Sequence, residues 1–241
     1  MTETVSFKRD LEGIPTIKLV IYGPAEAGKS TLLELYSIIR RIENPRSYSG
    51  KLASVKNPFE ETALFDQNTF VVDSKQDRQG PLLKYMIYAV AGQDRYKETR
   101  EIVLNGSEGV LLLLDANKAQ KDRNRKIIRE LKEFLGDKLG VNVPVVVALN
   151  KIDISSAIRF SRDEINQILR EEGLGDKIPL FEISCLDAKD DLLEILKKED
   201  KQSYFDDNGN FKKEMRPESV KNLIRPIYEL TKQVIEKKTG V

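Results

Sequence analysis

The sequence predicts an α/β domain built on a mostly parallel six-stranded sheet, with one antiparallel edge strand and helices on both faces. Several apolar runs are continuous rather than alternating, which is typical of strands covered on both faces. Segments with helical periodicity separate most of these runs, so right-handed crossovers between parallel strands are favoured. The linker DSKQDRQGP is too short for a crossover helix, so the two strands that flank it should pair as an antiparallel hairpin.

The order of elements follows from these patterns. Helices are expected from Ser30, over about residues 124–135, from Ser161 and from Asp187. Ser161 and Glu164 have the spacing of a capping box, which marks the start of the third helix. The predicted strands are residues 17–22, 63–72, 82–90, 109–114, 143–149 and 179–183.

The pattern changes near the C-terminus, which divides the chain into a domain over residues 1–198 and an extension over residues 199–241. The extension begins with SYFDDNGNFKK, which predicts a small hairpin around Asn208-Gly209, where a positive φ costs little. An amphipathic helix is expected to follow and to pack on the domain, with a break at Pro226. Its apolar stripe consists of Val220, Leu223, Ile224, Ile227, Leu230 and Val234.

Composition excludes several classes of function. Lys and Arg (40) nearly balance Asp and Glu (39), so the formal net charge of +1 gives no electrostatic sign of nucleic-acid binding. Cys185 is the only cysteine, so an internal disulfide is excluded and a reducing, cytoplasmic location is expected. No apolar run reaches the roughly 20 residues of a membrane span, and no lipidation motif is present, so we expect no direct membrane anchor. We also expect a monomer.

The motif GPAEAGKS lies between a predicted strand and a predicted helix, which is the context that a phosphate-binding P-loop requires. Lys29 is expected to reach the β- and γ-phosphates, Ser30 to offer its hydroxyl to Mg²⁺, and Thr31 to lie by the α-phosphate. The start of the helix directs its positive end at the phosphates. Backbone N–H groups of the loop complete the predicted site, from Gly23, Glu26, Ala27 and Gly28.

A second motif selects the base. Asn150, Lys151 and Asp153 follow a predicted strand, so they should lie at the carboxyl edge of the sheet, where ligands usually bind. Guanine presents two adjacent N–H donors that one carboxylate at Asp153 can accept, whereas adenine lacks that pair. Asn150 is expected to link neighbouring loops and touch the base, and Lys151 to lay its stem over the ring.

Ser184, Cys185 and Leu186 follow the last predicted strand and are expected to present a backbone N–H to the guanine oxygen. Cys185 is interpreted as a packed thiol rather than a nucleophile, because the chain has no histidine to activate it.

Together, GPAEAGKS, AGQ, NKID and ISCLD resemble the Ras-superfamily small GTPases over about residues 17–198. The details around AVAGQDRY and ETALFD look closer to the Arf-like and gliding-motility (MglA-type) GTPases. The resemblance implies a P-loop NTPase G domain that binds GTP/GDP with Mg²⁺ and hydrolyses GTP to GDP and phosphate. It also implies an effector, an exchange factor and a GTPase-activating protein, for which the MglA-type resemblance suggests a roadblock-type regulator.

Ala89 stands where the wider family has an aspartate that holds Mg²⁺ through water. The resemblance implies that Thr62 is the switch threonine that closes over Mg²⁺ and the γ-phosphate; Thr69 is the alternative, more consistent with a structural cross-strand role. Asp66 is a candidate for the missing carboxylate, or else an ordinary strand-face aspartate. Gln93, which follows the turn, is expected to orient the attacking water.

Lys29, Thr62 and Gln93 are therefore the candidate catalytic residues. Gly92 is expected to offer its N–H to the γ-phosphate, which requires a close backbone approach. Glu61 occupies the place of an arginine in the MglA-type pattern, so slow hydrolysis without a partner is expected.

Other readings stay open at this point. Arg95 and Arg100 are candidates to replace the missing arginine, although surface or partner-facing roles fit them better. A nucleotide-gated docking subunit with little hydrolysis is the alternative function, with the SRP-receptor β-type GTPases as a precedent. A P-loop ATPase or kinase is disfavoured, because Asp153 would find no paired donors on adenine.

Overall fold

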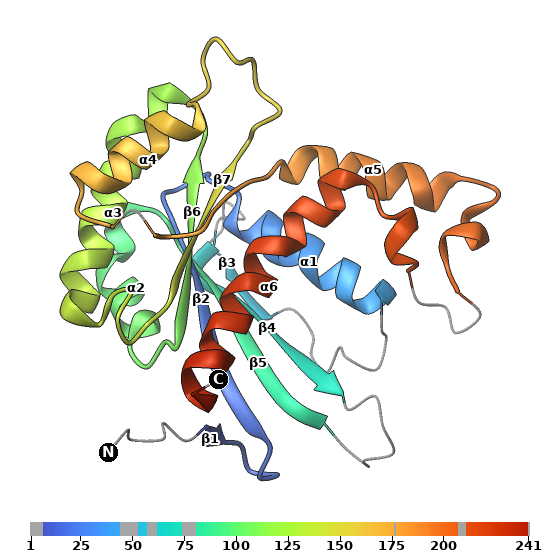
Figure 1. Ribbon diagram of the computed structural model, residues 1–241, viewed down its shortest axis with the longest axis horizontal. Helices are drawn as coiled ribbons and strands as arrows, with labels where there is room; N and C mark the ends of the chain where they lie inside the picture. The colour runs from blue at the N-terminus through green and yellow to red at the C-terminus, as the bar shows by residue number, and fades with distance from the viewer. Residues whose placement is uncertain are drawn as a thin grey trace.

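A central sheet lies between two layers of helices (Figure 1). The computed structural model describes residues 7–43, 53–56, 62–73, 81–175, 177–206 and 211–240, without the side chains of residues 53–56, 62–64, 73, 81–82 and 201. The strands are β1 (Lys8–Arg9), β2 (Pro15–Tyr22), β3 (Ala53–Lys56), β4 (Thr62–Asp73), β5 (Pro81–Val90), β6 (Gly109–Asp115), β7 (Val145–Asn150) and β8 (Leu180–Glu182).

The sheet confirms the predicted fold class. Its order is β3-β4-β5-β2-β6-β7-β8, and β1 pairs with β2 outside this path. The five strands from β5 to β8 along this path are parallel, and β4 runs antiparallel to β5 as the short linker predicts. Two short strands, β1 and β3, were not predicted. Because β3 pairs with the outer side of β4, it is β3 rather than β4 that lies at this end of the described sheet.

Six α-helices cover the described sheet: α1 (Lys29–Glu43), α2 (Lys97–Leu104), α3 (Lys121–Leu135), α4 (Arg162–Glu171), α5 (Cys185–Lys197) and α6 (Glu218–Thr239). Helices α1, α5 and α6 pack on one face, and α2, α3 and α4 on the other (Figure 1). Strand β2 contributes to both cores, because alternate side chains of a strand point to opposite faces. The capping box predicted at Ser161 and Glu164 is confirmed.

Helix α6 runs through Pro226 without interruption, so the predicted break is wrong. Apolar side chains from both sides of Pro226 enter the same core, including Leu223 and Leu230. This shared packing outweighs the lost backbone hydrogen bond. A backbone bridge pairs Phe205 with Phe211, as in the predicted hairpin, whose turn at Asn208-Gly209 lies outside the described residues.

The parallel strands bring the sequence motifs together. Strands β2, β5, β7 and β8 all end at the same edge of the sheet, and each is followed by one of the predicted site segments. The P-loop follows β2, Gly92 follows β5, the NKID motif spans the end of β7, and Ser184 lies between β8 and α5.

Candidate nucleotide-binding site

The P-loop is built of close backbone contacts that exclude side chains. Gly23 follows β2, and a Cβ there would lie 2.1 Å from the carbonyl oxygen of Leu113. Gly28 has a φ of +96°, and its Cβ would lie 2.4 Å from the side-chain nitrogen of Asn150. Both positions therefore require glycine, which explains the two fixed glycines of the motif.

Two other residues share an unusual backbone conformation. Within the described part of the chain, Glu26 (φ 63°) and Lys151 (φ 71°) are the non-glycine residues with positive φ. Such conformations cost free energy and concentrate at functional sites. One lies in the phosphate loop and the other in the NKID segment, so the backbone itself marks the two predicted halves of the site.

Lys29 is a buried cation at the start of α1. It is 6% exposed, and its Nζ donates a hydrogen bond to the carbonyl oxygen of Pro24 at 2.5 Å. Burial, together with the positive charge of Arg100, lowers the pKa of Lys29 to about 7, while the negative charge of Asp66 opposes the shift. A phosphate group would supply the negative charge that this ammonium lacks. Ser30 and Thr31 follow in the same first turn.

Asn150 links three segments through one amide. Its nitrogen donates to the carbonyl oxygen of Ala27 at 2.8 Å, and its oxygen accepts the backbone N–H of Cys185 at 3.0 Å. The predicted link between neighbouring loops is therefore present, from the P-loop across the end of β7 to the start of α5. Contact between Asn150 and a base stays a prediction.

Asp153 is oriented by a residue whose role the sequence reasoning missed. The hydroxyl of Ser184 donates to Oδ1 of Asp153 at 2.7 Å and accepts the backbone N–H of Asp187 at 3.0 Å. Ser184 is thus the N-cap of α5 and also supports Asp153, the carboxylate predicted to select the base. Its position immediately before a helix was the available signal.

A further residue, Asp115, was also missed. It ends β6 opposite Asn150 in the parallel ladder, and its Oδ2 pairs with Nζ of Lys151 at 2.7 Å. Its other oxygen accepts the backbone N–H of Asn117 at 2.9 Å. A lone carboxylate at the carboxyl end of an otherwise apolar, buried strand was the signal that could have found it.

Cys185 behaves as the sequence predicts for a packed thiol. Its side chain is buried, and burial raises its pKa to about 12, so little reactive thiolate forms near neutral pH. Its backbone N–H is held by Asn150, and the contact predicted from this segment to a guanine oxygen stays a prediction. The side chain of Leu186 is exposed at the start of α5.

The turn after β5 touches the P-loop directly. A Cβ on Gly92 would lie 2.4 Å from the backbone nitrogen of Ala25, so the turn meets the P-loop at a position that admits only glycine. The contact predicted between the Gly92 N–H and the γ-phosphate stays a prediction. Gln93 follows, and its buried amide oxygen has no hydrogen-bond partner among the described residues. Both residues line a pocket of about 280 Å³ that also includes Pro24 and Glu26 of the P-loop.

The two arginines after this turn differ. Arg95 is exposed and lies over the ring of Tyr96, with 5.0 Å from Cζ to the ring centre. Arg100 is buried in an ion pair with Glu130. The surface or partner-facing role predicted for Arg100 is therefore wrong, because a guanidinium bound on both sides by buried acceptors is not available at the surface.

Asp66 lies on β4 directly opposite Ala89 on β5. Its side chain is 2% exposed, and its charge acts on Lys29. A hydroxyl at Ser30 and a carboxylate at Asp66 suit Mg²⁺, which prefers oxygen ligands and binds through few protein groups when phosphates supply the others. Among the described residues, no cluster of three or more His, Cys, Asp or Glu side chains forms a separate metal site.

Of the two threonine candidates, Thr69 has a described side chain. Thr62 begins β4, but its side chain lies outside the described residues, as does all of Glu61. Thr69 lies inside β4, where its hydroxyl accepts a hydrogen bond from the amide of Gln67 at 2.9 Å. Thr69 is therefore hydrogen-bonded within its own strand, and the cross-strand role predicted for it stays a prediction.

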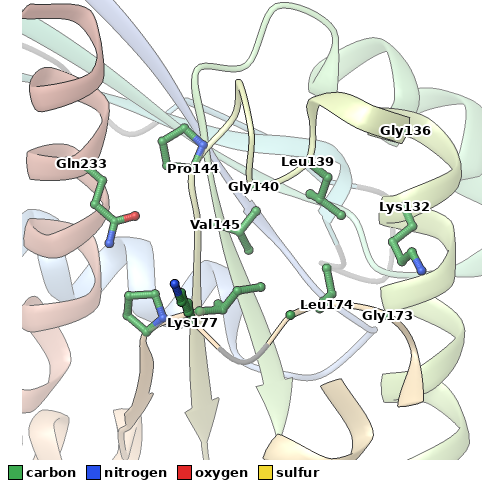
Figure 2. A pocket seen from close by; sticks show the side chains of 13 residues that line it. Lys132, Gly136, Leu139, Gly140, Pro144, Val145, Gly173, Leu174, Lys177 and Gln233 are labelled. Atoms are coloured by element: carbon green, nitrogen blue, oxygen red, sulfur yellow. The ribbon is translucent and has the colours of Figure 1, made fainter. Parts of the chain in front are cut away.

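A second pocket, of about 400 Å³, is lined by none of the candidate site residues. Figure 2 shows the side chains that surround it. It is lined near the start of β7 by Pro144 and Val145 and from α6 by Gln233. Because Asn150 stands at the other end of β7, this pocket belongs to the opposite edge of the sheet.

None of the described helices, including the long helix α6, combines the length and apolar character needed to cross a membrane.

Residues 18–153 match the family described as "Ras of Complex, Roc, domain of DAPkinase". This chain belongs to the Roc family of the Ras superfamily. The family match ends at Asp153, so α4, α5 and α6 lie beyond it.

Among curated relatives, the Roc-family chain is similar to the mutual gliding-motility protein MglA of Myxococcus xanthus, 28% identical over 144 residues that cover 58% of this chain and 70% of MglA. The GTP-binding nuclear protein GSP1 of Encephalitozoon cuniculi is 26% identical over 72% of this chain and 70% of that protein. The Ras-related protein Rab11C of Lotus japonicus is 29% identical over 52% of this chain and 59% of its own length. The predicted resemblance to Ras-superfamily GTPases, MglA included, is confirmed.

Proposed function

We propose that the protein is a GTP-binding molecular switch that hydrolyses GTP to GDP and phosphate. One observation carries the proposal: a single side chain, Asn150, holds the P-loop at Ala27 and the start of α5 at Cys185. The phosphate loop and the base-selecting Asp153 are thereby fixed relative to one another. Similarity to MglA and GSP1 supports the switch over a docking subunit that barely hydrolyses GTP.

In this proposal GTP and GDP are bound by the P-loop and the NKID segment, and Mg²⁺ is held by Ser30, Asp66 and Thr62. Bound Mg²⁺ supplies neutralisation of the charge on the β- and γ-phosphates. Lys29 adds a second positive charge from the protein. Gly92 contacts the γ-phosphate through its backbone, and Gln93 orients the attacking water.

Hydrolysis is proposed to be slow without a partner. The position before Thr62 holds Glu61 instead of an arginine. Arg100 donates to Glu130 and to backbone carbonyls, so in this proposal it makes no direct contact with the γ-phosphate. A GTPase-activating protein, of the roadblock type suggested by the MglA-like sequence, would supply or order the missing group, and an exchange factor and an effector complete the cycle. We further propose that the protein acts as a cytoplasmic monomer.

A nucleotide panel tests the proposal. We expect tight binding of GTP and GDP and discrimination of about 10⁴ against ATP, because Asp153 accepts from two guanine donors. In Asp153→Asn, guanine affinity should fall by a comparable factor while affinity for xanthosine triphosphate rises, since xanthine has an oxygen where guanine has its amine. Asp190→Asn, an exposed site on α5, is the matched control. Tight ATP binding without competition from GTP would contradict the proposal.

A further inference from the structure

A buried ion pair joins α2 to α3 beneath the turn that follows β5. Arg100 is 0% exposed, and its Nε and Nη2 donate to the two carboxylate oxygens of Glu130 at 2.6 and 2.9 Å. Two parallel hydrogen bonds of this kind fix the plane of a guanidinium as well as its position. The orientation of Arg100 is therefore set by α3.

The remaining terminal nitrogen of Arg100 binds the turn itself. Its Nη1 donates to the carbonyl oxygen of Gln93 at 2.6 Å and to that of Ala91 at 3.2 Å. These two carbonyls stand on either side of Gly92. A single guanidinium thus holds the backbone before and after the glycine that touches the P-loop.

Glu130 is also tied to the strand that leads into the P-loop. The hydroxyl of Tyr22 donates to the same carboxylate, and Tyr22 is the last residue of β2, directly before Gly23. Burial, with the nearby charge of Glu130, holds the pKa of Tyr22 well above its ordinary value, so the hydroxyl keeps its proton. The network therefore connects the P-loop strand, α3, α2 and the turn after β5.

The side chain of Gln93 is left available by this arrangement. Its backbone carbonyl is used by Arg100 and by the N–H of Tyr96 at 3.0 Å, but its buried amide oxygen has no partner among the described residues. That amide lines the pocket beside Pro24 and Ala25 of the P-loop. A buried acceptor without a partner at a pocket is suited to a water molecule.

We propose that Arg100 is a positioning residue for hydrolysis: fixed by Glu130, it holds the backbone at Gln93 so that the Gln93 amide faces the water beside the P-loop. This inference rests on the proposed function, in which Gln93 orients the attacking water. A displacement of about 1 Å at a reacting group can cost about 100-fold in rate, so the effect of losing this hold should be large.

The test compares the same substitution at two places on α3. Glu130→Gln removes the charge that fixes Arg100, whereas Glu133→Gln removes an exposed carboxylate that pairs with Lys97 of α2 at 3.0 Å. Glu133 is 64% exposed, so its pair contributes little. Single-turnover hydrolysis at saturating GTP, GDP affinity, and hydrogen exchange of peptides containing Tyr96 are measured for both variants.

For Glu130→Gln we expect hydrolysis slowed about 10- to 100-fold, faster exchange at Tyr96, and a GDP affinity within about threefold of wild type. Glu133→Gln should match wild type in all three. Arg100→Lys is the second variant, because lysine keeps the charge but cannot make the forked contacts, and it replaces Glu130→Gln if that protein does not fold. Its expected results are the same.

Unchanged hydrolysis in both Glu130→Gln and Arg100→Lys would overturn the positioning role. A fall in GDP affinity as large as the fall in hydrolysis rate would also overturn it. A wild-type protein that binds no guanine nucleotide would instead overturn the proposed function. The exchange comparison needs no nucleotide, so it would still decide whether Arg100 holds the turn.

Discussion

Asp66 and Ala89 are directly opposed across the antiparallel β4–β5 ladder. Opposed residues of such a pair lie on the same face of the sheet, and here that face carries α1. The carboxylate that the wider family places at the position of Ala89 is thus present one strand away. Its charge acts on Lys29, at the start of α1, and we propose that Asp66 takes the place of the carboxylate missing at Ala89.

The first prediction concerns the carboxylate of Asp66. Asp66→Ala should weaken the Mg²⁺-dependent part of GTP affinity about 10- to 100-fold, as removal of groups that support a metal commonly does. Adding Ala89→Asp to that variant should restore part of the loss, because it returns a carboxylate to the same face. GTP release is measured as Mg²⁺ is titrated. Gln67→Ala, the next residue along β4, is the control, and an unchanged Mg²⁺ dependence in Asp66→Ala would remove Asp66 from the metal site.

The second prediction follows from the pKa of Lys29. With a pKa of about 7, Lys29 is mostly neutral at pH 8 in the nucleotide-free protein, and phosphates should recharge it. Nucleotide binding at pH 8 should therefore take up close to one proton. Calorimetry in buffers of different ionisation enthalpy measures this uptake. Lys29→Arg should show none, because arginine stays charged; equal uptake in both proteins would refute the assignment.

The same shift has a consequence for stability. The folded-state pKa of Lys29 lies below its ordinary value of 10.5, so between about pH 7 and pH 10.5 the unfolded chain holds more protons at this site. The contribution of Lys29 to the stability of the nucleotide-free protein should accordingly rise with pH across that window. Nucleotide should flatten the dependence. Denaturant unfolding of wild type and Lys29→Arg, with and without GDP, measures it.

The parts of the site that sequence alone could predict are those encoded by local backbone geometry. Gly23 and Gly28 are required by contacts closer than any side chain allows, and such positions leave a fixed spacing in the sequence. Asn150 could be placed at the sheet edge because it ends a buried strand. The continuous apolar runs predicted six of the strands, and the short linker predicted the antiparallel pairing of β4 with β5.

The remaining features depend on partners distant in sequence. Arg100 reads as a surface residue in KETREIVL, and only the packing of α2 on α3 brings Glu130 to it. Asp115 acquires its role through Lys151 on the neighbouring strand. Strand β3, with the sequence ASVK, has no clear apolar pattern and is recognised only by its pairing with β4.

The fourth prediction tests Asp115. Asp115→Asn keeps an acceptor for the backbone N–H of Asn117 but removes the charge opposite Lys151. The charge-assisted contact between Lys151 and Asp115 is then lost, which should lower the affinity for guanine nucleotides by about 10- to 100-fold. The loss should be equal for GTP and GDP, because Lys151 is proposed to contact the base, which both share, and not the phosphates. Calorimetry compares the two nucleotides. Lys118→Gln, which breaks an exposed pair, is the control. A loss confined to GTP would contradict the role.

The last prediction concerns residues 199–241, which we propose are structurally part of the domain. Helix α6 packs against the backbone of β6: a Cβ on Gly109 would lie 2.7 Å from Cγ2 of Val234 and 3.0 Å from Cδ1 of Leu230. Leu230 also belongs to the core shared with α1 and α5. Leu230→Ala should therefore lower the stability of the whole domain by about 2–5 kcal/mol.

Thermal unfolding in the presence of GDP measures this change, and a single transition shifted to lower temperature is expected. Tyr228→Ser, at a position 71% exposed on the same helix, should change stability by less than about 0.5 kcal/mol. An early transition for the tail, followed by unchanged melting of the GDP-binding part, would show that α6 is a separate appendage. The difference matters for function, because a helix packed into the core shared with α1 and α5 ties the stability of the site to the extension.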